Sequence, residues 1–189
     1  MVRARTVSKL TTLVLVALAL VPEVRAQAAP GGLWLGLGVG GGVSTSSEFS
    51  GSDRWAGAFY ARVGGTLSQR AQLGGEFIVW AKKRTSGSPA RGNVSLVALL
   101  YPTETGTVFL KAGAGLAVAA LLRQAPAGGV TTRDAQGLGL SAGAGGQLRL
   151  GRSVSLTPNL DVLYQYFPAG QDPSLANFVV LGTLGLTFR

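Results

Sequence analysis

Residues 154–166 alternate between apolar and polar side chains with a period of two. Five of the six odd positions are polar, from Ser155 to Gln165. The even positions are all apolar or aromatic, namely Val154, Leu156, Pro158, Leu160, Val162, Tyr164 and Tyr166. A strand places two such sets on opposite faces, whereas a helix would mix them. The segment is therefore predicted to be a β-strand, with a bulge at Pro158 because proline cannot donate to the ladder.

The same alternation recurs along the rest of the chain and predicts eight strands. Their expected ranges are 33–43, 57–67, 71–81, 93–101, 107–121, 137–150, 154–167 and 176–189. The connections at 68–70, 102–106 and 151–153 are short, whereas those at 44–56, 82–92, 122–136 and 168–175 are longer. Alternating short and long connections are typical of a barrel whose two ends face different compartments. We predict an all-β fold, an eight-stranded antiparallel up-and-down transmembrane β-barrel.

The two faces of the predicted strands differ in composition, which indicates the face that meets water. One face consists mainly of Leu, Val, Phe and Ala, and the other of Gly, Ser, Thr and a few charged residues. Only 13% of the chain is charged, whereas about 25–35% is usual on the exterior of a soluble domain. The apolar face therefore suits lipid, and the polar face suits a narrow lumen. A soluble secreted barrel is the alternative, distinguished by whether the mature protein needs detergent.

The first residues have the layout of a secretory signal peptide. A basic start precedes a run of 12 residues at 10–21 that is apolar apart from Thr11 and Thr12, and small residues then allow cleavage after Ala26 or Ala28. An N-terminal membrane anchor is less favoured because a spanning helix needs about 20 apolar residues. The expected organisation is a signal peptide at 1–26, a short N-terminal lead at 27–32 and a barrel at 33–189.

Cysteine and histidine are both absent from the chain. Their absence removes thiolate chemistry, cysteine-based metal sites and the usual general base. We therefore expect no catalytic site, no cofactor and no bound metal. The formal net charge of +9 falls to +6 once residues 1–26 are removed. Because no basic stripe with interleaved aromatic residues is present, nucleic-acid binding is not expected.

Four of the predicted strands have an unusual glycine-rich alternation. They contain the segments LWLGLGVGGG at 33–42, KAGAGLAVA at 111–119, LSAGAGGQLRL at 140–150 and FVVLGTLGLTFR at 178–189. Together with the signal peptide, these segments resemble the small eight-stranded outer-membrane barrels of Gram-negative-type bacteria, of the OmpA, OmpX and OmpW kind. The resemblance implies a porin-like protein of the cell envelope, exported through the periplasm and inserted into the bacterial outer membrane as a monomer.

Members of this group typically end in an aromatic residue preceded by apolar residues at every second position, a signal that the outer-membrane assembly machinery recognises. The matching positions here are Phe178, Val180, Leu184, Leu186 and Phe188. Arg189 departs from the pattern because it makes the aromatic residue penultimate. Small barrels that act as acyltransferases or deacylases on lipid A use a histidine, which this chain lacks. The resemblance therefore favours a non-enzymatic barrel.

Charged residues at the alternating strand positions expected to face the lumen form a first candidate site. If the turn at 68–70 is centred on Gln69, Arg62 lies opposite Glu76 and residue 67 lies opposite residue 71. Asp161 would similarly lie opposite a glycine of the neighbouring strand. The expected lumen cluster is Arg62, Glu76, Lys111, Arg149 and Asp161. It is interpreted either as a plug of mutually neutralising charges, which we favour, or as an ionic gate or proton path.

Apolar residues at other positions expected to face the lumen form a second candidate site. They lie toward the long connections and are Ile78, Trp80, Leu163, Val179 and Leu181. One interpretation is a hydrophobic pocket open to the outside, as in OmpW-like barrels thought to pass small apolar molecules. The other is dry packing above the charged residues, which is commoner in a small barrel.

Basic residues in the second long connection form a possible surface site. They are Lys82, Lys83, Arg84 and Arg91, and they are expected to meet lipopolysaccharide phosphates or simply to be solvated. The sequence thus predicts a non-enzymatic integral outer-membrane barrel with a plugged polar lumen and a structural or surface-interacting role. The alternative is a barrel that binds or passes small hydrophobic molecules.

Overall fold

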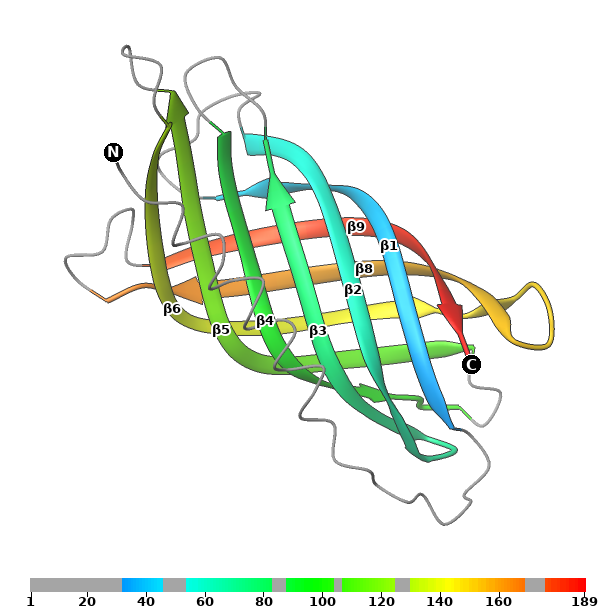
Figure 1. Cartoon of the computed structure of the whole chain (residues 1–189). Helices are drawn as coiled ribbons and strands as arrows, with labels where there is room; N and C mark the ends of the chain where they lie inside the picture. The colour runs from blue at the N-terminus through cyan, green and yellow to red at the C-terminus, as the bar shows by residue number, and fades with distance from the viewer. Residues whose placement is uncertain (1–31, 46–53, 83–87, 104–106, 125–129, 169–175) are drawn as a thin grey trace.

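The computed structural model describes residues 32–45, 54–82, 88–103, 107–124, 130–168 and 176–189. The predicted signal peptide lies outside these residues. The strands are β1 (Leu33–Ser44), β2 (Trp55–Ser68), β3 (Ala71–Ala81), β4 (Ser88–Leu100), β5 (Val108–Gln124), β6 (Val130–Gly146), β7 (Leu148–Arg149), β8 (Val154–Tyr166) and β9 (Ala176–Phe188) (Figure 1). No helix within the described residues is long and apolar enough to cross a membrane.

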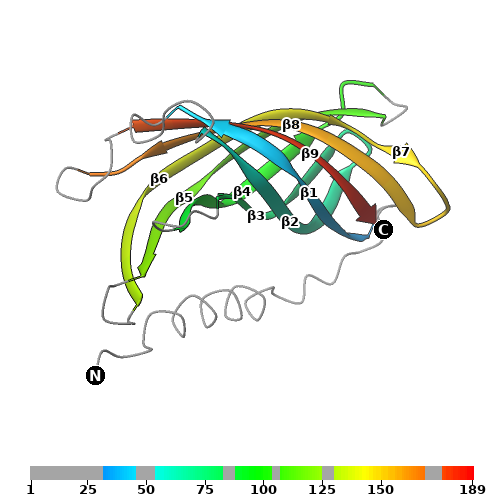
Figure 2. The same cartoon turned by 90° about the horizontal axis from the view of Figure 1, so that it is seen from above.

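The sheet closes on itself. The strands pair in the order β6-β5-β4-β3-β2-β1-β9-β8-β7, in which the first strand, β1, pairs with the last, β9, and an additional pairing joins β6 to β8. Every pairing is antiparallel. The two residues of β7 continue β6 along the same neighbour, β8, so that β6 and β7 together act as one strand. The predicted eight-stranded antiparallel barrel is therefore confirmed, and the view from above shows its strands wrapping around a common interior (Figure 2).

Pro158 accounts for the division between β6 and β7. Gly145 pairs with Asn159 and Leu148 pairs with Leu156, so the register is the same on both sides of the interruption. Pro158 lies between these pairs and has no N–H with which to bond the neighbouring strand. The N–H of Gln147 donates instead to the carbonyl of Thr107, at 2.7 Å. The predicted bulge at Pro158 is wrong, because β8 continues past it along β9 without a change of register.

A bulge occurs instead beside the first short turn. The register between β2 and β3 shifts between Thr66 and Ser68, so that Ser68 pairs with Ala71. The expected pairing of residue 67 with residue 71 is therefore off by one. Further from the turn, Arg62 pairs with Glu76 as predicted.

Three strands extend further toward the long connections than predicted. Ser88 already pairs with Leu122, and Gln124 pairs with Val130. Most of the added residues are small, polar or charged, with Leu122 and Val130 as exceptions, which is why the sequence indicated loops there. Their backbones nevertheless continue the ladder, because pairing with an adjacent strand does not require apolar side chains.

Burial follows the predicted alternation. In β9 every second residue is buried from Asn177 to Thr187, and the intervening residues are exposed. The exposed positions across the barrel include many Leu, Val and Phe side chains, such as Leu160, which is 59% exposed. The apolar face is thus on the outside, as a barrel surrounded by hydrocarbon requires.

The interior is crowded, and glycines make the closest approaches possible. Tyr60 points inward from β2 and lies over Gly38 of β1 and Gly185 of β9. A Cβ atom at Gly38 would lie 2.3 Å from the Tyr60 ring, and one at Gly185 would lie 2.2 Å from its hydroxyl. Since real Cβ atoms do not come so close, these two positions need glycine in order for Tyr60 to fit.

The outward assignment of Leu160 can be tested by substitution. Leu160→Arg should destabilise the folded barrel by about 2–4 kcal/mol if the residue lies near the bilayer midplane, because a charge there faces hydrocarbon. Equilibrium unfolding in urea, followed in lipid vesicles, measures this loss. Leu160→Phe keeps the position apolar and should change stability little. Wild-type stability for Leu160→Arg would contradict the assignment of the outer face.

Candidate functional site

Four charged side chains meet in the middle of the lumen. Arg62 of β2 and Lys111 of β5 each contact both Glu76 of β3 and Asp161 of β8. The Lys111 Nζ lies 2.8 Å from Glu76 Oε2 and 2.7 Å from Asp161 Oδ1, and Arg62 Nη2 lies 3.4 Å from Asp161 Oδ2. Arg62 Nε donates to Glu76 Oε2. We call these residues the charge quartet, and its formal charges cancel.

Neutral groups complete the coordination of the quartet. Arg62 Nη1 donates to Asn159 Oδ1 at 3.1 Å, and the guanidinium carbon lies 4.2 Å from the centre of the Tyr60 ring. Asn159 in turn donates to the Tyr60 hydroxyl, at 3.2 Å. All four quartet residues are at most 3% exposed. Charges buried this deeply are tolerated only when they are paired and hydrogen-bonded, as these are.

The sequence placed five residues in this cluster, and the structure brings four of them together. Arg149 is the exception, because it lies in β7 at the end of the barrel and its side chain is exposed. Alternation assigns Arg149 to the inner face but does not show how deep along the strand it lies. Gln147 is the last buried residue of that inner series before Arg149. Asp161 pairs with Gly143, as expected.

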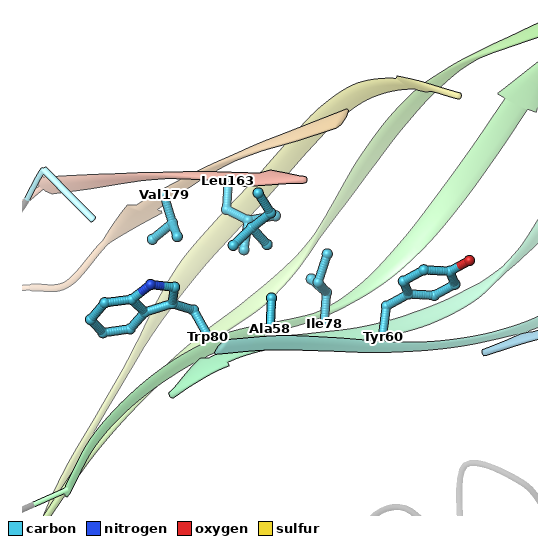
Figure 3. Close-up of a cluster of buried hydrophobic side chains, with 7 residues drawn as sticks. Ala58, Tyr60, Ile78, Trp80, Leu163 and Val179 are labelled. Carbon is cyan, nitrogen blue, oxygen red and sulfur yellow. The ribbon is translucent and has the colours of Figure 1, made fainter. Parts of the chain in front are cut away.

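The predicted apolar residues also meet. Ile78, Trp80, Leu163, Val179 and Leu181 belong to one cluster with Ala58 and Tyr60. Figure 3 shows Trp80 and Ile78 rising from one wall toward Leu163 and Val179 on the facing wall. The five predicted residues have no exposed surface, and the indole N–H of Trp80 donates to the carbonyl of Gly42 at 3.0 Å. Their side chains therefore pack against one another across the lumen.

A chain of neutral polar side chains also crosses the lumen, and the sequence analysis did not identify it. Ser44 donates to Asn177 at 3.0 Å, Asn177 donates to Gln165 at 3.2 Å, and Gln165 donates to Asn93 at 2.8 Å. Asn93 then donates to the carbonyl of Leu140, at 3.2 Å. This amide chain joins β1, β9, β8, β4 and β6. Alternation along the strands predicts that these side chains face the lumen. It does not show which of the inward-facing side chains are close enough to form hydrogen bonds.

Aromatic and polar groups fill the end of the lumen that carries the short turns. Trp34, Leu99, Tyr101 and Phe109 form an apolar cluster there. The Tyr101 hydroxyl donates to Gln72 at 3.0 Å and accepts from Gln147 at 2.9 Å. Burial raises the pKa of Tyr101, which keeps this hydroxyl available as a donor. Arg189 donates to both Tyr101 and Gln147, so the residue that departs from the terminal aromatic pattern helps to close this end.

The predicted basic surface site is only partly supported by the positions of its residues. Lys82 follows β3 directly and is half-buried, whereas Lys83 and Arg84 lie outside the described residues. Arg91 is not in a loop, because it lies in β4 opposite Trp80 and is 2% exposed. The correction follows from the early start of β4, which turns part of the expected connection into barrel wall. Arg91 therefore contributes to the interior and not to an outer basic surface.

The predicted assembly residues all lie on one face. Phe178, Val180, Leu184, Leu186 and Phe188 alternate along β9 and are exposed on the outer surface. Phe178 also contacts Tyr164 of β8, with ring centroids 5.0 Å apart. These side chains are therefore part of the apolar exterior of the folded barrel.

The interior has the chemistry of a packed core. Within the described residues, no group of three or more His, Cys, Asp or Glu residues is placed to hold a metal ion. The charge quartet has its donors and acceptors turned toward one another, and apolar clusters lie on either side of it along the lumen. The structure thus defines a closed eight-stranded barrel with an apolar exterior and a lumen occupied by side chains.

Comparisons with known proteins show which solved barrels this chain is similar to. No protein-family model matches the sequence, and no curated protein matches it. Among solved structures, Ail of Yersinia pestis, in complex with the heparin analogue sucrose octasulfate, is similar with a TM-score of 0.61 and 13% identity, over 84% of this chain and 97% of Ail. Neisserial surface protein A is similar with a TM-score of 0.57 and 14% identity, over 83% of this chain and 96% of that protein. The chain therefore has the fold of the small eight-stranded outer-membrane β-barrels, as its sequence resemblance indicated.

The balance of the quartet can be tested with neutral substitutions. Glu76→Gln should destabilise the barrel by about 3–5 kcal/mol, because it leaves two buried cations facing one carboxylate. Glu76→Gln combined with Lys111→Met should cost less than Glu76→Gln alone, because the pair of Arg62 and Asp161 is again neutral. Urea unfolding of the wild type, both single variants and the double variant measures the coupling. Independent, additive losses would contradict this account of the quartet.

Proposed function

We propose that the mature chain is a non-enzymatic, integral β-barrel protein of the bacterial outer membrane with a plugged lumen. Its role is structural or surface-interacting. The observation that carries the proposal is the charge quartet, which joins β2, β3, β5 and β8 across the lumen. The charged groups of the quartet pair with one another. An eight-stranded barrel leaves space in its lumen only for side chains.

The groups above and below the quartet support the same proposal. The amide chain and the cluster of Trp80 and Leu163 lie toward the long connections. The cluster of Trp34 and Tyr101 lies toward the short turns. An ion crossing the lumen would have to displace packed side chains at each of these levels. The same observations favour a plug over an ionic gate.

Cell fractionation tests the location. The protein should be recovered with the outer membrane after cleavage behind Ala26 or Ala28, because the outer face is apolar and the sheet has no open edge. An unboiled sample should migrate differently from a boiled one in detergent gels, since a closed hydrogen-bonded barrel resists unfolding. Recovery as a soluble periplasmic protein with unchanged mobility would contradict the proposal.

Planar bilayer recording tests the plug. The wild-type protein should carry no steady ion current, because the quartet and the clusters on both sides of it occupy the lumen. The same preparation must show heat-dependent mobility, which verifies that folded barrels were added. A well-resolved unitary conductance in the wild type would overturn the plug and favour a conduit.

Binding or passage of small hydrophobic molecules is the second candidate function. It is motivated by the apolar cluster around Trp80, which lies in the half of the barrel nearest the long connections. A bound ligand would raise the unfolding temperature, and a charge introduced at Leu181 would abolish that rise. The five predicted residues of the cluster have no exposed surface, which favours packing, so no rise is expected with an aliphatic alcohol as the probe.

The surface-interacting role is proposed for the loop that follows β3. Lys82, Lys83 and Arg84 provide three adjacent positive charges, which suit phosphate groups of lipopolysaccharide. Ail, which shares the fold, has been solved in complex with a sulfated heparin analogue. The outer-membrane assembly machinery is the proposed partner of the alternating apolar residues of β9 during insertion.

A further inference from the structure

The seam between β1 and β9, where the sheet closes, has almost no inward side chains on its β1 side. β1 pairs with β9 from Leu35 to Ser44. The inward positions of β1 between Trp34 and Ser44 are all glycines, at 36, 38, 40 and 42. Glycine has no side chain with which to contact the rest of the interior. The inward side-chain contacts that β1 itself provides are therefore confined to its two ends, at Trp34 and Ser44.

At the short-turn end, both strands of the seam reach the same residue, Tyr101. Trp34 of β1 belongs to one buried apolar cluster with Tyr101, Leu99 and Phe109. Arg189 directly follows β9, and its Nη2 donates to the Tyr101 hydroxyl at 3.4 Å and to Oε1 of Gln147. β1 is thus connected to Tyr101 by apolar packing, and β9 is connected to it by a hydrogen bond.

Tyr101 lies on the wall opposite the seam. It directly follows β4, which is four strands away from β9 in either direction around the barrel when β6 and β7 are counted as one. Tyr101 is also fixed to its own wall, because its N–H donates to the carbonyl of Arg70 at 2.9 Å and its hydroxyl donates to Gln72 at 3.0 Å. The hydrogen bond from Arg189 to Tyr101 therefore crosses the mouth of the lumen.

The position of this contact indicates when it forms. Ladder hydrogen bonds join adjacent strands, so they can form in a sheet that is still open. A hydrogen bond between residues on opposite walls requires the sheet to have curled into a barrel. The contact between Arg189 and Tyr101 is therefore expected to form after closure and to break when the seam opens at this end.

We propose that Arg189 and Tyr101 form a latch that holds the seam between β1 and β9 closed at the short-turn end of the barrel. The latch adds to the proposed function a means by which the folded barrel resists opening. An interaction made only after the rate-limiting step of folding slows unfolding and leaves the folding rate unchanged. The latch is therefore expected to act on the lifetime of the closed barrel.

Hydrogen exchange of the folded barrel in detergent micelles, followed by NMR, tests the latch. Arg189→Gln removes the charged donor, and Tyr101→Phe removes the hydroxyl but keeps the ring in the apolar cluster. Each variant should increase severalfold the exchange rates of the amides that donate across the seam in 35–37 and 186–188. The amides around Val94, which pairs with Leu116 in another part of the sheet, should keep their wild-type rates. Unchanged seam rates, or an equal increase in both places, would overturn the proposal.

Arg152→Gln is the matched control for the loss of charge. Arg152 lies in the turn before β8, at the same end of the barrel, and its side chain is exposed. Its substitution removes the same charge as Arg189→Gln and should leave the seam rates unchanged. Faster exchange at the seam in this variant as well would show a general effect of charge and would overturn the latch.

Folding and unfolding rates in urea test the order of events. Arg189→Gln should raise the unfolding rate severalfold and leave the folding rate within about twofold of the wild type. The double variant with Tyr101→Phe should unfold more slowly than the product of the two single effects predicts, because both substitutions remove the same hydrogen bond. Heat-dependent gel mobility verifies that each variant has folded. Slower folding with unchanged unfolding, or fully independent effects, would overturn the proposal.

Discussion

Pairing of the first strand, β1, with the last strand, β9, closes the sheet and determines what the interior of this barrel can contain. Once that pairing is made, each of the eight strands has two neighbours if β6 and β7 are counted as one, and the backbone hydrogen bonds are satisfied within the wall. Eight strands then enclose a lumen only wide enough for side chains. Charges in so narrow a space must be neutralised by one another. The arrangement in which Arg62 and Lys111 each contact both Glu76 and Asp161 meets that requirement.

The remaining interior is arranged around this neutral centre by differences in side-chain size. Glycines at 38 and 185 make room for Tyr60, which packs beneath Arg62 and accepts a hydrogen bond from Asn159. Larger side chains from β2 and β3 then reach across to β8 and β9. Because Gly38 and Gly185 lie next to each other on the adjoining strands β1 and β9, the Tyr60 ring can lie over them and fill this part of the lumen.

Alternation along the sequence predicts well whether a residue faces the lumen or the exterior. It predicts poorly how far along the barrel axis the residue lies. Arg62, Glu76, Lys111 and Asp161 were assigned to the lumen from parity, and their opposite partners followed from the positions of the turns. Arg149 shares that parity but lies at the exposed end, and Arg91 was assigned to a loop although it is buried in β4. The position at which a strand ends depends on backbone pairing, and this position cannot be predicted from a run of small and charged residues. Two links of the amide chain, from Gln165 to Asn93 and from Asn93 to Leu140, depend on how far side chains reach between strands that are not neighbours. Alternation within one strand contains no such information.

Cancellation of charge within the lumen also affects the response of the barrel to an electrical potential. A single unpaired charge displaced across 100 mV would change in energy by about 2.3 kcal/mol. The forces on the two cations of the quartet oppose those on its two carboxylates, so the field exerts no net pull on the group. A potential across the surrounding membrane would therefore exert no net force on the quartet, so the quartet cannot act as a voltage sensor.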